Sequence, residues 1–153
     1  MEKEAIVFEP GLGKFLTARG SEMFFKAIGA TTSGTFSLME RTLPPGGRKP
    51  PAHSHDNCEE AYYVLDGSVE FAVGNRTYTG GPRSFVLVPR GVVHTFGNGG
   101  AALARLLVLH APALDGYFEE LQALWSGGST PSHEDELALM RRHGMEPANL
   151  PEK

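Results

Sequence analysis

The chain has 153 residues, of which 41% are hydrophobic and 21% charged, as is typical of one globular domain with its own core. Its net charge is −4 and its basic residues are scattered, which argues against a nucleic-acid or anionic-membrane partner. The single cysteine, Cys58, excludes an internal disulfide and a cysteine-based zinc site.

Membrane and export signals are missing from the sequence. No apolar run approaches the length of a membrane-spanning segment, and Met1–Ala5 lacks the basic and apolar regions of a signal peptide. We therefore expect no membrane partner and a cytoplasmic location.

Short β-strands separated by Gly, Pro and Asn are predicted for the middle of the chain. Thr35–Thr42 alternates between apolar and polar residues and stops at Pro44-Pro45-Gly46-Gly47. The Asp66-Gly67 pair predicts a hairpin turn. Phe85–Val88 is continuously apolar, which favours a buried strand. The other predicted strands are Ala61–Leu65, Ser68–Val73, Arg76–Thr79, Val92–Phe96 and Leu103–Leu109. Many short strands at close spacing indicate a sandwich or barrel.

The C-terminal part changes to a helical pattern. Leu114–Trp125 places Phe118, Leu121 and Trp125 on one helical stripe. Thr130-Pro131 predicts the start of a second helix, which ends at Gly144. We therefore predict a β domain over residues 1–112 and a helical extension over residues 113–153 that packs on this domain or on a partner subunit.

Three histidines and one glutamate carry the chemistry that the sequence predicts. His53 and His55 are two residues apart, which points both imidazoles to the same face of a strand. Glu59 and Glu60 point to opposite faces, so only one of them can join the histidines. His94 lies on a later strand. Imidazoles with one carboxylate suit one divalent ion of Fe, Mn, Ni, Cu or Zn and leave room for water or substrate.

These residues resemble the two motifs of the cupin family. The first, Gly-x5-His-x-His-x3,4-Glu-x6-Gly, is matched over residues 47–67 by Gly47, His53, His55, Glu60 and Gly67. The second, Gly-x5-Pro-x-Gly-x2-His-x3-Asn, is matched over residues 83–98 by Pro89, Gly91, His94 and Asn98. Arg83 stands where the second motif begins with glycine. The resemblance implies an all-β jelly-roll barrel with a short helical tail. It also implies one metal ion inside the barrel, held by His53, His55, Glu60 and His94.

A longer resemblance extends to quercetin 2,3-dioxygenase-like cupins. It is carried by Lys26–Glu40, by Leu43–Gly47 and by Glu60–Gly67. It implies a metal-dependent dioxygenase, an oxidoreductase acting on a small aromatic or enolic compound, with Glu60 taking the proton of the substrate hydroxyl. The oligomeric state that the resemblance implies and the apolar residues of the helical extension favour a homodimer. Four residues share the inward phase of the ligands and are expected to line an apolar substrate pocket: Tyr62, Val64, Phe71 and Phe96.

Two other functions fit the same motifs. One is isomerisation or cyclisation, in which the metal acts as a Lewis acid without O2. The other is non-catalytic binding of a small ligand, because function depends on the pocket lining and not on the fold.

The remaining polar residues have simpler interpretations. Asn98 caps a turn, although it could instead orient a metal ligand. Cys58 is an inert loop thiol. We expect His110 to be packed in the core or at a strand edge. The residues expected to be solvated are Glu59, Lys26, Glu40, His133 and His143.

Overall fold

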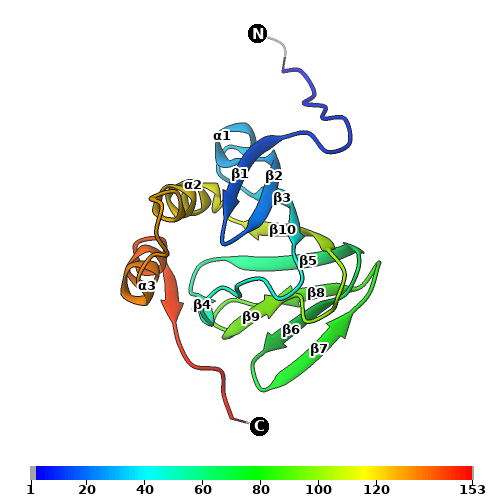
Figure 1. Ribbon diagram of the computed structural model, residues 1–153. Coiled ribbons are helices and arrows are strands. Elements are labelled where there is room, and N and C mark those ends of the chain that lie inside the picture. The colour runs from blue at the N-terminus through cyan, green and yellow to red at the C-terminus, as the bar shows by residue number, and fades with distance from the viewer. Residues whose placement is uncertain (1–2, 153) are drawn as a thin grey trace.

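Two antiparallel β-sheets form the body of the molecule (Figure 1). The computed structural model describes residues 3–152. The larger sheet contains, from edge to edge, β1 (Lys14–Ala18), β2 (Ser21–Ala27), β3 (Ser37–Leu43), β10 (Ala104–Ala111), β5 (Glu59–Asp66) and β8 (Phe85–Val88). The smaller sheet contains β11 (Met145–Pro147), β4 (His53–His55), β9 (His94–Gly97), β6 (Val69–Val73) and β7 (Arg76–Gly80). The helices are α1 (Gly29–Thr32), α2 (Asp115–Trp125) and α3 (His133–Arg142).

The core lies between the two sheets because alternate side chains of each strand point inward. In β3 and β10 every second residue is buried. Tyr62 of the larger sheet packs against Phe71 and Phe96 of the smaller one, with ring centroids 5.1 and 5.0 Å apart. The predicted all-β jelly-roll architecture is thereby confirmed.

Two turns at the motif borders have a positive φ. Gly67, after β5, has φ +75°, and a Cβ there would lie 2.6 Å from the carbonyl oxygen of Leu103. Only glycine fits such a position without strain. Arg83 has φ 74° where the second motif begins with glycine. The turn before β8 therefore keeps the left-handed backbone although the residue has changed.

The structure differs from the sequence prediction at several places. Phe85–Val88 is not buried along its whole length, because β8 is an edge strand that leaves Phe85 and Leu87 exposed, whereas Val88 lies in the core. An antiparallel hairpin of β1 and β2 forms in the N-terminal part, for which no strand bounds were predicted. The second C-terminal helix begins after Ser132, whose side chain accepts a hydrogen bond from the Asp135 amide, and not after Thr130.

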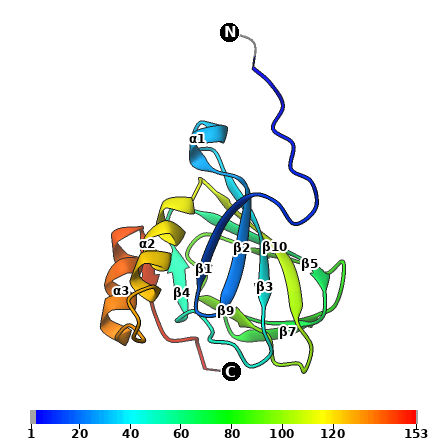
Figure 2. The ribbon, with the colours of Figure 1, turned by 45° about the horizontal axis from the view of Figure 1, so that its top comes forward.

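The C-terminal extension packs on the β domain of its own chain (Figure 2). Helix α2 contacts β1, and β11 adds to the edge of the smaller sheet beside β4. From α3, Glu136 accepts a hydrogen bond from Arg19 Nε at 2.8 Å, inside the protein. In residues 3–152 no helix has the length and hydropathy needed to span a membrane.

The apolar residues of α2 that suggested a dimer contact are largely covered within the chain. Phe118 and Leu121 are buried, and the Phe118 ring lies 5.8 Å from that of Phe25. Exposed apolar side chains occur instead at Ile6–Phe8, in the segment that extends away from the body in Figures 1 and 2. The homodimer stays a prediction.

Candidate metal centre

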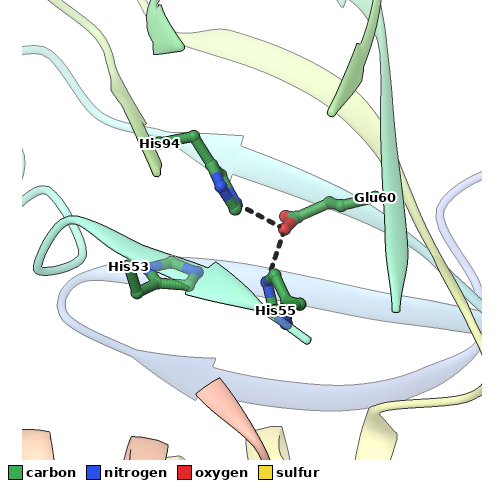
Figure 3. A group of neighbouring side chains, drawn as sticks. All are labelled: His53, His55, Glu60 and His94. Atoms are coloured by element: carbon green, nitrogen blue, oxygen red, sulfur yellow. Dashed lines mark hydrogen bonds and ion pairs between the residues drawn. The ribbon is translucent and has the colours of Figure 1, made fainter. Parts of the chain in front are cut away.

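Four side chains from three strands meet between the sheets (Figure 3). His53 and His55 come from β4, His94 from β9 and Glu60 from β5. His53 and His94 are direct cross-strand neighbours in the smaller sheet, and Glu60 faces them from the larger sheet. Each of the four offers one ligand atom, and these atoms all lie within 4.8 Å of one another. All four residues are buried, so the cluster is an interior site and not a surface patch.

The Glu60 carboxylate lies at the centre of the cluster. Its Oε2 is 2.8 Å from Nε2 of His94 and 3.0 Å from Nε2 of His55. Its Oε1 accepts a hydrogen bond from the Tyr62 hydroxyl at 2.5 Å and lies 3.1 Å from Nε2 of His110. Burial by itself would raise the pKa of Glu60, but the charge and hydrogen bond of His110, with the hydrogen bonds of His55 and His94, hold it well below 4.5. The carboxylate is therefore ionised at neutral pH.

Backbone carbonyls orient two of the imidazoles. His53 Nδ1 lies 2.7 Å from the Pro51 carbonyl oxygen, and His94 Nδ1 lies 2.9 Å from that of Val92. Carbonyl oxygens only accept, so both Nδ1 atoms donate. Burial lowers the pKa of His53 to about 3, and the charge of the neighbouring His94 is the second cause. His53 is therefore neutral, and its Nε2 carries the lone pair that a metal requires.

The contacts of His94 favour a proton on Nε2, the nitrogen that would bind a metal. Its Nδ1 donates to a carbonyl and its Nε2 faces the Glu60 carboxylate, so both ring nitrogens act as donors. Burial opposes the charged imidazolium, but the hydrogen bond and charge of Glu60 outweigh burial and raise the pKa of His94. The three imidazoles and the Glu60 carboxylate form a donor set that fits one divalent transition metal. A metal bound there would take the place of the proton between His94 and Glu60.

His110 packs beside this centre, a position that the sequence analysis did not predict. It was expected to be a packed or edge histidine, and it is buried, but directly opposite Glu60 in the β10–β5 register. Its Nδ1 has no hydrogen-bond partner among residues 3–152. In β10 the alternate residues Leu106, Val108 and His110 point into the core. The sequence does not show which residues alternate inward, because the strand is almost continuously apolar.

Two of the simpler residue interpretations are confirmed. Asn98 Nδ2 donates to the carbonyl oxygens of Leu43 and Ala102, at 2.9 and 2.7 Å, so it holds a turn. Cys58 is a buried loop thiol whose pKa is raised to about 11, by burial first and then by the charge of Glu60. It is not an activated nucleophile.

The residues expected to be solvated lie at or near the surface, with one exception. Glu59 is half-exposed and pairs with Arg90. Lys26 and Glu40 lie 4.0 Å apart on partly buried strand faces. His133 is exposed, whereas His143 pairs with Glu120 and packs edge-on against Tyr117, so His143 is not simply solvated.

The cavity beside the candidate ligands is small. Its volume is about 20 Å³, and the residues around it include Arg41, His53, Glu60, Phe96, His110 and Tyr117. Of the expected pocket residues, Tyr62, Val64 and Phe71 are buried in the core and Phe96 lines this cavity. Phe71 also lines a larger groove of about 390 Å³ between β7 and β8. The interior side chains around the centre are thus more polar than the sequence analysis expected.

The chain is similar to known proteins over the segment that contains the candidate ligands. The family model described as "Cupin domain" matches residues 39–110, a segment that includes all four candidate ligands. A germin-like protein, subfamily T member 3, of Arabidopsis thaliana is 35% identical over 91 residues, covering 56% of this chain. The chain thus spans only 39% of that relative's length.

Solved structures share the fold. The cupin domain of Cnp3 from Schizosaccharomyces pombe has a TM-score of 0.61 at 17% identity, covering 78% of this chain and 82% of that one. The polyketide cyclase RemF from Streptomyces resistomycificus has a TM-score of 0.55 at 29% identity, covering 72% of this chain and 80% of that one.

Proposed function

The chain belongs to the cupin superfamily through its one cupin domain, and we propose that it is a metal-dependent enzyme that acts on a small aromatic or enolic compound. The observation that carries the proposal is the buried cluster of His53, His55, Glu60 and His94. A bound divalent ion would supply the Lewis acidity that makes a substrate hydroxyl ionise at neutral pH.

The protein's own residues would then position the ligands and move one proton. Neutral His53, His55 and His94 would hold the ion together with Glu60, so His94 would first have to release any proton that it shares with Glu60. Glu60 is the proton acceptor for the substrate hydroxyl, since its carboxylate is ionised and lies inside the cavity wall. Tyr62 and His110 contact the other carboxylate oxygen and keep Oε2 directed toward the centre.

Ring-cleaving dioxygenation is the first candidate reaction, as in the quercetinase-like cupins that the sequence resembles. It would consume O2 and, on a flavonol, release carbon monoxide. The second candidate is cyclisation or isomerisation without O2, which the likeness to the polyketide cyclase RemF supports. The cytoplasmic location and a small-molecule partner belong to the same proposal.

Metal binding is tested first, by elemental analysis of the purified protein and reconstitution with Mn, Fe, Ni, Cu or Zn. We expect one ion per chain, and an affinity at least about tenfold lower in Glu60→Gln. Glu59→Gln is the matched control, because Glu59 is the neighbouring carboxylate but faces solvent beside Arg90. Equal metal affinity of Glu60→Gln and Glu59→Gln would refute the assignment of the site.

Turnover is tested next with the reconstituted protein. Oxygen uptake on addition of a flavonol, with carbon monoxide released, supports the dioxygenase. Conversion of an enolic substrate at the same rate without air supports cyclisation or isomerisation. Binding of phenolic compounds with no turnover under either condition would overturn the enzyme proposal in favour of a ligand-binding protein.

A further inference from the structure

Two arginines lie inside the β domain, near the candidate metal centre. Arg19 and Arg41 are only 5% and 3% exposed. Buried cations are normally paired with carboxylates, because an isolated charge is costly to remove from water. Arg19 follows this rule, since its Nε donates to Glu136 at 2.8 Å. Arg41 does not follow it.

Arg41 has only a hydroxyl and an aromatic ring as direct partners. Its Nε donates to Ser21 Oγ at 2.9 Å, and its Cζ lies 5.2 Å from the ring centroid of Phe96. Within residues 3–152 Arg41 forms no salt bridge, and the bond to Ser21 is the one side-chain hydrogen bond that its guanidinium makes. A guanidinium presents five N–H donors in a planar fork that matches a carboxylate. Most of this donor capacity is unused.

Arg41 lines the same small cavity as two of the candidate metal ligands. Arg41 is on the inward face of β3, and the cavity of about 20 Å³ is bordered by Arg41 together with His53 and Glu60. That volume holds about one water molecule. The cavity is therefore smaller than a carboxylate, and an anionic group bound between Arg41 and the centre has to displace the side chains that border it.

Charge favours an anion at this place. A divalent ion held by one carboxylate and neutral imidazoles would keep a net positive charge, and Arg41 adds a second positive charge at the cavity wall. Burial lowers the pKa of Arg41 to about 10, and the charge of Arg19 is the second cause. Arg41 therefore remains a cation at neutral pH. An anionic ligand would satisfy both positive centres and the free N–H donors at once.

We propose that Arg41 is the anchor for an anionic group of the ligand bound at the metal centre, and that the substrate is a small carboxylic acid or similar oxyanion. This inference rests on the proposed function, because only an enzyme has a substrate. It restricts the proposed aromatic or enolic substrate to compounds that carry an acidic group. Tyr117 and Phe118 of α2 and Met145 of β11 also border the cavity. The remainder of a larger ligand must therefore displace the C-terminal extension.

The test compares formate with formamide, which have nearly the same size but differ in charge. Both are titrated against the cobalt-loaded protein, followed by its visible spectrum, and against the metal-free protein, followed by thermal unfolding at constant ionic strength. We expect formate to bind at least about tenfold more tightly than formamide, since a charge-assisted bidentate pair is lost with the neutral compound. Equal affinity for the two compounds would overturn the proposal without any variant.

Variants then assign the effect to Arg41. Arg41→Gln is expected to weaken formate binding at least about tenfold and to abolish the preference over formamide, whereas Arg41→Lys keeps part of both. Arg105→Gln is the control, because Arg105 is a half-exposed arginine paired with Asp66. If Arg41→Gln does not fold, Arg41→Lys decides, since it retains the buried charge. Wild-type formate affinity in a folded Arg41 variant would refute the assignment.

The two proposals fail in different ways. Selective formate binding without turnover of any acid would leave the anion site intact and contradict the enzyme proposal. Turnover of neutral phenols by a protein that does not distinguish formate from formamide would support the enzyme and refute the role of Arg41.

Discussion

Replacement of the motif glycine Gly67 by alanine tests how the hairpin after β5 is built. Gly67 has φ +75°, and an added Cβ would lie 2.6 Å from the Leu103 carbonyl oxygen and 2.9 Å from the Ala104 Cα. Both contacts are to backbone at the start of β10, the strand that pairs with β5 along most of its length. The new methyl group therefore cannot be accommodated by rotation of a side chain.

The expected loss of stability follows from three contributions. A left-handed backbone costs an alanine about 1–2 kcal/mol. Overpacking against a rigid neighbour costs about 1–3 kcal/mol. The less flexible unfolded chain offsets about 0.4–1 kcal/mol of this. The sum is a loss of about 1–4.5 kcal/mol, or a fall in Tm of about 2–18 °C for a domain of this size.

Gly74→Ala provides the matched control. Gly74 also has a positive φ, of +59°, but its nearest neighbour is Val92 Cγ1, 3.9 Å from the added Cβ. Its loss should be about 1 kcal/mol, because only the backbone contribution remains. Both variants are measured by thermal and urea unfolding of the metal-free protein. If Gly67→Ala loses no more stability than Gly74→Ala, the close approach of β10 to this turn is not what requires glycine.

Further perturbations address other parts of the molecule. Arg83→Gly should stabilise the protein by about 0.5–1 kcal/mol in urea unfolding, because φ 74° strains an arginine; a loss would contradict this. Glu136→Gln should lower stability by about 3 kcal/mol and speed proteolysis of the C-terminal extension, since it leaves the buried Arg19 without a charged partner; unchanged proteolysis would show that this pair does not hold the extension. Cys58 should react with iodoacetamide at pH 8 about 100-fold more slowly than in the urea-unfolded chain, because its pKa is about 11; equal rates would contradict its burial. The raised pKa of His94 means that its proton stabilises the metal-free fold below pH 6.5 and that this contribution is lost as the pH rises through the folded pKa. Zinc affinity should therefore increase from pH 6 to pH 8 with proton release, which calorimetry in buffers of different ionisation enthalpy measures; a pH-independent affinity would refute the shared proton.

The choice between Glu59 and Glu60 illustrates what local periodicity predicts. Adjacent residues of a strand point to opposite faces, and the structure places Glu60 inside and Glu59 on the surface beside Arg90. The same rule fails for Phe85–Val88. A continuous apolar run does not tell a central strand from an edge strand, and the position of β8 depends on strand order.

The sequence by itself determined the identity and spacing of the four candidate ligands and the turn at Gly67. These depend on strand alternation and on backbone sterics, which act between residues close together in the chain. Only the tertiary structure placed His110 opposite Glu60, turned Arg41 toward the same cavity and closed that cavity with the C-terminal extension. Those contacts are set by strand register and by the packing of the two sheets, which join residues far apart in the chain and leave no periodic pattern in the sequence.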